Sequence, residues 1–179
     1  MTNKWKRISG RIGSWSLLLC AAAIVCAVFL QQVPGMFRRF SVSLSGAEYL
    51  GMEGVILQQQ KNDCGPAALA MVLNGAGVRI QREEILQQVN MSENGTTMEE
   101  LRRFADSRGV ILEGWKLSIG ELSGRKLPAL LFIRQEHFVT ADSIVHGEIF
   151  FRDPAVGRLK MPEERFQKLW NGYALIMKE

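Results

Sequence analysis

The stretch Gln58-Gln-Gln-Lys-Asn-Asp-Cys-Gly-Pro-Ala-Ala-Leu69 joins a polar segment to the start of an apolar helix. Pro66 suits the first turn of that helix, where a missing N–H has no intrahelical partner, and the run from Ala67 to Leu73 continues it. Cys64 therefore lies at a predicted helix N-terminus, where the helix dipole and the free backbone N–H groups favour a thiolate. This placement makes Cys64 a candidate nucleophile.

The domain around this stretch has one thiol. Cys20 and Cys26 lie in an apolar N-terminal segment, so Cys64 has no cysteine partner within the domain. A lone cysteine is more often a small buried hydrophobe than a nucleophile. The chemical interpretation of Cys64 therefore depends on a base and an orienting group elsewhere in the chain.

The N-terminal segment predicts a membrane anchor. Ser14 to Leu30 is an uncharged run of 17 residues, at the short end of the roughly 17–25 that span a bilayer as a helix. We assign a basic segment to residues 1–13 and a transmembrane anchor to residues 14–33. Four basic residues precede the run and two follow it, which predicts a cytoplasmic N-terminus and an extracytoplasmic domain. A cleaved signal peptide is the main alternative, although no clear Ala-x-Ala site ends the run.

Composition assigns the rest of the chain to a linker and one domain. Residues 34–51 read as a linker because glycine, serine and scattered aromatic residues dominate them, and residues 52–179 read as a domain. The chain of 179 residues is 47% hydrophobic, which is enough for one core. Its net charge of +4 is modest, and we find no basic stripe with interleaved aromatic residues. We therefore expect no nucleic-acid partner.

Helices are predicted in the first half of the domain. A helix is expected over Gln81–Val89, with its charged residues Arg82, Glu83 and Glu84 exposed. Thr97-Met-Glu-Glu100 forms a capping box, and the helix that it starts ends at Gly109.

Strands dominate the second half. His146-Gly147 is a two-residue connection typical of a β-hairpin. Strands are expected at 110–116, 129–133, 137–145, 148–152, 158–160 and 173–177, with short helices at 118–122 and 162–169. Helices first and mostly antiparallel strands afterwards predict an α+β fold.

Catalysis by a thiol needs a base, a group that orients the base, and donors for the oxyanion. The chain has two histidines. His146 lies in the predicted hairpin turn, whereas His137 opens a strand and is the better candidate. The upstream amides of Gln58, Gln59, Gln60 and Asn62 could each join the backbone N–H of Cys64 as oxyanion donors, and chemistry alone does not choose among them.

The hairpin supplies the candidate orienting group. Folding it back brings Asp153 to the same open end as His137, but a strict two-residue turn would pair Asp153 with Thr140, on the wrong face. A β-bulge, or a change of direction at Asp153-Pro154, is needed to aim the carboxylate at the imidazole. Asp142, on the same hairpin, is the alternative.

Together these residues resemble the bacteriocin-processing cysteine peptidases that cleave after double-glycine leader sequences. The resemblance covers about Met52 to Met177 and includes Gln58 six residues before the cysteine. Its motifs are Asp63-Cys-Gly-Pro-Ala-Ala-Leu69, Gly95-Thr-Thr97, His137-Phe-Val139, Asp153-Pro-Ala155 sixteen residues after the histidine, and Phe166-Gln-Lys-Leu-Trp170.

The resemblance implies a papain-like cysteine peptidase. Cys64 would be the nucleophile, His137 the general base and acid, Asp153 the orienting group, and Gln58 the oxyanion-hole side chain. The implied substrate is a peptide or protein with a leader sequence, and no metal or cofactor is implied.

The sequence departs from the better-known family members, whose peptidase domain is the cytosolic N-terminal part of an ABC transporter. No Gly-x4-Gly-Lys-Ser/Thr motif follows the domain here, and a predicted membrane span precedes it. We expect a stand-alone, single-pass protein of the bacterial inner membrane, with a separate ABC exporter as its partner. With the domain outside, a leader delivered from the cytosol would be cut during or after export.

Two alternatives stay open. The same fold could be a non-catalytic leader-binding or transporter accessory domain, or a papain-like hydrolase of another peptide substrate. Each candidate residue alone also fits a structural role. Cys64, His137, Asp153 and Gln58 together at family spacing favour the peptidase.

Overall fold

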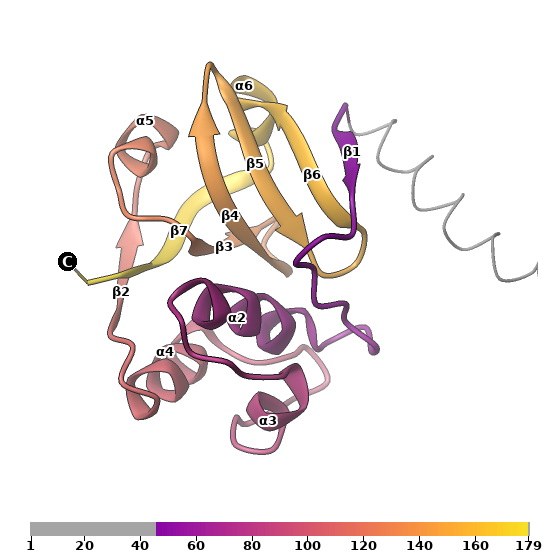
Figure 1. Cartoon of the computed structure of the whole chain (residues 1–179), viewed down its shortest axis with the longest axis vertical. Coiled ribbons are helices and arrows are strands. Elements are labelled where there is room, and N and C mark those ends of the chain that lie inside the picture. The colour runs from indigo at the N-terminus through magenta and orange to yellow at the C-terminus, as the bar shows by residue number, and fades with distance from the viewer. Residues whose placement is uncertain (1–45, 179) are drawn as a thin grey trace, which may run out of the picture. The chain divides into compact units, whose positions relative to one another are not determined.

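The structure is a computed structural model, and it describes residues 46–178 (Figure 1). The predicted basic segment 1–13, the predicted anchor 14–33 and most of the predicted linker 34–51 lie outside the described residues. Among residues 46–178 no helix has the length and apolar character needed to cross a bilayer. The described part has the expected α+β architecture, with helices grouped before the main run of strands.

The seven strands form one sheet in the order β1-β6-β5-β4-β3-β7-β2, and every neighbouring pair is antiparallel. Strands β3 to β6 follow one another as hairpins, and β7 returns to pair with β3. The strands are β1 (Glu48–Gly51), β2 (Leu112–Lys116), β3 (Ala129–Ile133), β4 (His137–Val145), β5 (Glu148–Asp153), β6 (Gly157–Pro162) and β7 (Trp170–Met177).

Strand β1 lies inside the segment that composition assigned to a linker. It pairs with β6 at one edge of the sheet, with Tyr49 opposite Leu159. The folded sheet therefore begins before residue 52, and the linker assignment is wrong for residues 48–51.

Three helices lie on one side of the sheet (Figure 1): α2 (Cys64–Gly75), α3 (Arg82–Leu86) and α4 (Met98–Ser107). Helices α2 and α4 pack against strands of the sheet, and α3 packs on α2. Half of the predicted capping box is present at the start of α4: Thr97 Oγ1 accepts the N–H of Glu100 at 3.2 Å, whereas the Glu100 carboxylate lies 3.6 Å from Arg103 Nη1. Helix α3 ends at Leu86, so the predicted helix to Val89 was too long. Two short helices, α5 (Ile119–Ser123) and α6 (Glu163–Phe166), complete the elements.

The two faces of the sheet cover two separate cores. Leu130 and Phe138 belong to the core shared with α2, α3 and α4, whereas their neighbours Leu131 and Val139 belong to the core shared with α5 and α6. This alternation is the two-residue period of a strand buried on both faces. Helix α2 is buried from Cys64 to Leu73, so its N-terminal residue is held by the packing of the whole helix.

Candidate active site

The β4–β5 hairpin places the predicted orienting group. Its turn is the predicted His146-Gly147, and the φ angles of 53° and 76° are those of a type I′ turn. Val145 pairs with Glu148 next to the turn, but further along Ala141 pairs with Phe151, which leaves Asp142 as a bulge. The pairing of Thr140 with Arg152, continued by one residue, places Asp153 opposite Val139. The predicted bulge is confirmed, and it moves Asp153 onto the face of His137.

The carboxylate of Asp153 is bonded to the imidazole of His137. His137 Nε2 lies 2.8 Å from Asp153 Oδ1, which also accepts the N–H of Ala155 at 2.8 Å. Asp142 is bonded elsewhere, because Arg152 Nε donates to both of its oxygens at 3.0 Å. The structure thus brings Asp153, and not the alternative Asp142, to His137.

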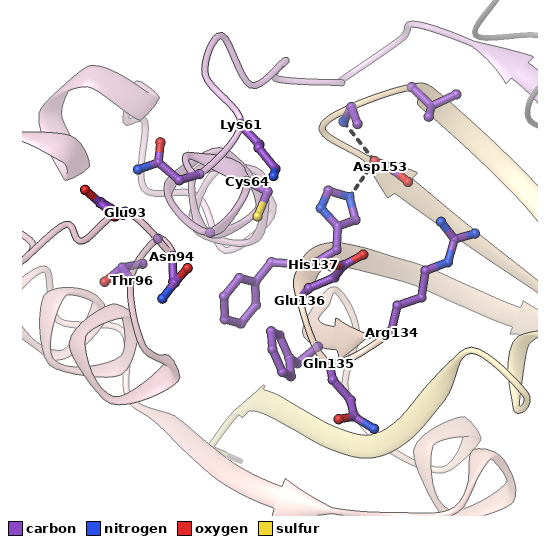
Figure 2. Close-up of a pocket in the computed structure, with 17 residues that line it drawn as sticks. Lys61, Cys64, Glu93, Asn94, Thr96, Arg134, Gln135, Glu136, His137 and Asp153 are labelled. Atoms are coloured by element: carbon purple, nitrogen blue, oxygen red, sulfur yellow. Dashed lines mark hydrogen bonds and ion pairs between the residues drawn. The ribbon is translucent and has the colours of Figure 1, made fainter.

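The thiol of Cys64 lies on the other side of the imidazole. Cys64 is the first residue of α2, as predicted, and Figure 2 shows its sulfur facing the His137 ring while Asp153 lies beyond the opposite nitrogen. With Nε2 bound to the carboxylate, Nδ1 is the ring nitrogen available to the thiol. The first backbone N–H groups of a helix have no intrahelical acceptor, so the N–H of Cys64 can donate to a ligand.

The surroundings of His137 raise its pKa to about 9. Burial of the ring lowers the pKa, but the hydrogen bond to Asp153 and the neighbouring Cys64 thiol outweigh that effect. The imidazole is therefore protonated at neutral pH. A cationic imidazole beside a thiol favours the thiolate, which is the nucleophilic form of cysteine.

The side chain of Gln58 does not reach the cleft in this structure. Its Nε2 donates to the carbonyl oxygens of Gln60 at 2.9 Å and Lys61 at 3.4 Å. Asn62 lies on the cleft wall, but its amide donates to the carbonyl oxygen of Ser92 at 2.8 Å. The oxyanion role of Gln58 stays a prediction.

A cleft of about 560 Å³ surrounds Cys64 and His137 (Figure 2). The rings of Phe132 and Phe138 form its apolar part, with centroids 4.8 Å apart. Its lining comes from the α2 start, the 93–96 loop, the β3–β4 connection and the β5–β6 turn: Lys61, Asn62, Cys64, Gly65, Glu93, Asn94, Gly95, Thr96, Phe132, Arg134, Gln135, Glu136, His137, Phe138, Asp153, Ala155 and Val156.

A buried ion pair next to the nucleophile was missed by the sequence analysis. Arg82, predicted to be exposed, is 3% exposed, and its Nη1 lies 2.9 Å from Asp63 Oδ2. The prediction was wrong because an arginine beside two glutamates in a short amphipathic helix normally faces solvent. The sequence signal was the acidic residue directly before Cys64, but nothing in the sequence joins it to Arg82.

Metal-binding geometry is absent from the described part of the chain. No group of three or more histidine, cysteine, aspartate or glutamate side chains within residues 46–178 could hold a metal ion.

A thiol at the start of a buried helix, with an imidazole between it and a carboxylate on an antiparallel sheet, defines the papain-like cysteine peptidase class. The sequence pattern of the Peptidase C39 family matches residues 52–179, and the chain belongs to that family.

Comparison with individual proteins agrees with this assignment. An uncharacterized protein of Methanothermobacter marburgensis is 32% identical over 129 residues, which cover 72% of this chain and 91% of that protein. The probable microcin-H47 secretion/processing ATP-binding protein MchF of Escherichia coli is 29% identical over 121 residues, which cover 68% of this chain and 17% of MchF. The crystal structure of a double glycine motif protease from an AMS/PCAT transporter in complex with the leader peptide matches with a TM-score of 0.65 and 27% identity, over 69% of this chain and 89% of that one.

Proposed function

We propose that this protein is a cysteine endopeptidase in which Cys64, His137 and Asp153 are the catalytic residues. The observation that carries the proposal is the position of the His137 ring between the Cys64 thiol and the Asp153 carboxylate, 2.8 Å from the latter. The surroundings hold the His137 pKa at about 9, and a protonated imidazole beside a cysteine favours the nucleophilic thiolate form.

The reaction would proceed by acyl transfer. The Cys64 thiolate attacks the carbonyl carbon of the scissile peptide bond, and the resulting oxyanion accepts the N–H of Cys64. His137 then protonates the leaving amine, the C–N bond breaks, and a thioester remains on Cys64. Water, deprotonated by His137, attacks the thioester, and release of the acid regenerates the thiolate.

Gln58 would supply the second oxyanion donor. Its amide would have to turn one N–H towards the cleft, and the contact with the Lys61 carbonyl is the easier one to give up, because at 3.4 Å it is longer than the 2.9 Å bond to Gln60. Catalytic hydrogen bonds are often poorly aligned before substrate binds.

The proposed substrate is a secreted peptide whose leader ends in a double glycine. The match to a double glycine motif protease in complex with its leader peptide supports this class.

In the same proposal, residues 14–33 anchor the protein in the cell membrane, with the peptidase domain outside the cytoplasm and a separate ABC exporter delivering the substrate. The charge difference across the apolar run supports this orientation. Protease added to intact cells or spheroplasts should digest the domain, as followed by immunoblotting. A domain digested only after cell lysis would reverse the orientation.

The decisive experiment uses the purified full chain and a synthetic peptide with a leader that ends in Gly-Gly. We expect cleavage after the second glycine, as read by mass spectrometry, and no cleavage by Cys64→Ala. A matched peptide with Ala-Ala in place of Gly-Gly tests the substrate class. Binding of the leader without cleavage would favour the accessory-domain function, and equal cleavage of both peptides would favour a papain-like hydrolase of another substrate.

A further inference from the structure

Asp63 and Arg82 form an ion pair that is almost completely buried. The side chains of Arg82 and Asp63 are 4% and 2% exposed, and Nη1 lies 2.9 Å from Oδ2. Removing two charges from water is unfavourable unless their geometry and hydrogen bonds compensate. The hydrogen bonds around the pair should therefore show what offsets this cost and which part of the chain the pair holds in place.

Both partners also bind the backbone of the loop that leads to Cys64. We call residues 57–63 the nucleophile loop. Arg82 Nη1 donates to the carbonyl oxygen of Leu57 at 3.1 Å. The Asp63 carboxylate accepts the N–H of Gln59 and the N–H of Gln60, each at 3.1 Å. The peptide groups on both sides of Gln58 are thus held by one buried ion pair.

The nucleophile loop is tied to the histidine side of the cleft as well. The N–H of Gln58 donates to the carbonyl oxygen of Pro154 at 3.0 Å. Pro154 directly follows Asp153, the carboxylate that holds His137. The loop therefore links α3, through Arg82, to the turn that carries the orienting group.

Arginine is suited to this position. Its planar guanidinium presents several donors in a fixed geometry, and here Nη1 bonds both Leu57 and Asp63 while Nη2 bonds Glu83. A lysine has a compact ammonium on a flexible stem and would hold these acceptors less rigidly.

We propose that Asp63 and Arg82 are positioning residues, which hold the nucleophile loop so that the Gln58 amide and the Cys64 N–H converge on the oxyanion. This inference rests on the proposed peptidase function. Neither residue touches the reacting atoms. Their contribution would be made through the backbone of residues 57 to 60 and through the start of α2.

The test separates positioning of the oxyanion donors from simple stability. In the purified full chain, Arg82→Met and Arg82→Lys are compared with Ile85→Ala, a matched control that removes a fully buried side chain from the same helix. Two rates are measured at one pH: cleavage of the Gly-Gly leader peptide, and alkylation of Cys64 by iodoacetamide, followed by mass spectrometry of the Cys64 peptide. Alkylation needs the thiolate but no oxyanion donor.

We expect Arg82→Met to lower kcat by about 10- to 100-fold, with KM and the alkylation rate within about threefold of wild type. Arg82→Lys should recover part of kcat. Ile85→Ala should lower both rates only in proportion to the unfolded fraction, as measured by circular dichroism.

Three results would overturn the inference: a kcat for Arg82→Met within about threefold of wild type, equal losses of cleavage and alkylation, or full activity of Arg82→Lys. If Arg82→Met does not fold, Arg82→Lys and Asp63→Asn are judged by the same pattern. A wild-type protein that is alkylated at Cys64 but cuts no Gly-Gly peptide would instead count against the proposed function.

Discussion

The two sides of the cleft reach their geometry by different means. On the sheet side, His137 and Asp153 are sixteen residues apart, yet the backbone pairing of one hairpin brings them within 2.8 Å. On the helical side, Gln58 and Cys64 are six residues apart, yet the loop between them is held by side chains, those of Asp63 and Arg82.

This difference shows which changes each side can tolerate. Strand pairing uses main-chain groups that every residue except proline provides, so the sheet side should withstand most side-chain replacements away from His137 and Asp153. A loop has no repeating ladder of hydrogen bonds. The conformation of the nucleophile loop depends on particular buried side chains. A substitution in α3 should therefore alter the position of the loop that leads to Cys64.

The largest effect is expected at the nucleophile. Cys64→Ala removes the nucleophile, which the helical side and the sheet side of the cleft both position. The rate of cleavage of a Gly-Gly leader peptide should fall by about 10⁴-fold or more. The rate is measured by chromatography of the products, with circular dichroism to verify the fold. Residual cleavage within about tenfold of wild type would mean that the thiol is not the nucleophile.

The next effect tests the sheet side with a matched pair of aspartates on one hairpin. Asp153→Ala should lower kcat by about 10³-fold, because His137 loses both its orienting bond and the main group that raises its pKa. Asp142→Asn should leave kcat within about threefold, because Asp142 is bonded to Arg152 and not to the imidazole. The reverse pattern would exchange the roles of the two carboxylates.

The sequence predicted the sheet side better than the helical side. The turn at His146-Gly147 could be located from residue types alone, and counting from it showed that either a bulge or a change of direction at Asp153-Pro154 was needed. The position of the bulge at Asp142 could not be predicted, because it depends on how the two strands bury their alternate faces. The start of α2 at Cys64 was predicted because proline and the apolar run act locally.

Two failures have a common cause. Arg82 is buried because Asp63, nineteen residues away, and the carbonyl of Leu57 accept its hydrogen bonds. Strand β1 exists because β6 offers an edge to pair with, although its own residues have the composition of a linker. In both cases the partner determines the structure, and a local pattern in the sequence contains no information about that partner.

Gln58 provides the third test, on the helical side. Gln58→Ala should lower kcat by about 100-fold if its amide turns to the oxyanion during the reaction. Gln59→Ala is the matched control, because the described contact of Gln59 with Asp63 uses its backbone N–H. If both variants lower kcat by the same small factor, Gln58 does not donate to the oxyanion beside the Cys64 N–H. The oxyanion role that the family resemblance implies for Gln58 would then be weakened.

The fourth prediction concerns the charge of His137. Folding raises its pKa to about 9, so the protonated ring stabilises the fold fully below about pH 6.5, and this contribution is lost as the pH rises through about 9. Cleavage should decline over the same alkaline limb, because the thiolate loses its cationic partner. NMR titration of His137, assigned with His146→Ala, measures the pKa directly.

Two variants sharpen that titration. Asp153→Asn should lower the His137 pKa more than Cys64→Ala does, because the hydrogen bond to Asp153 is the largest of the effects that raise this pKa, ahead of the hydrogen bond to Cys64. If Cys64→Ala lowers the His137 pKa more than Asp153→Asn does, Cys64, on the helical side of the cleft, contributes most to stabilising the imidazolium.

The smallest effect is expected where the two sides meet. Thr140 of β4 is fully buried, and its Oγ1 donates to the carbonyl oxygen of Ala68 in α2 at 2.9 Å. Thr140→Val replaces the hydroxyl by a methyl group of similar shape, and the carbonyl keeps its place in the hydrogen-bond ladder of the helix. The free energy of unfolding should fall by about 1 kcal/mol, as measured by urea denaturation with an unchanged m-value.

The rate of cleavage by Thr140→Val should stay within about threefold of wild type, because strand pairing continues to fix His137 relative to Asp153. A loss of kcat beyond about tenfold would show that the sheet side also depends on a single side-chain contact, and the contrast between the two sides of the cleft would then fail.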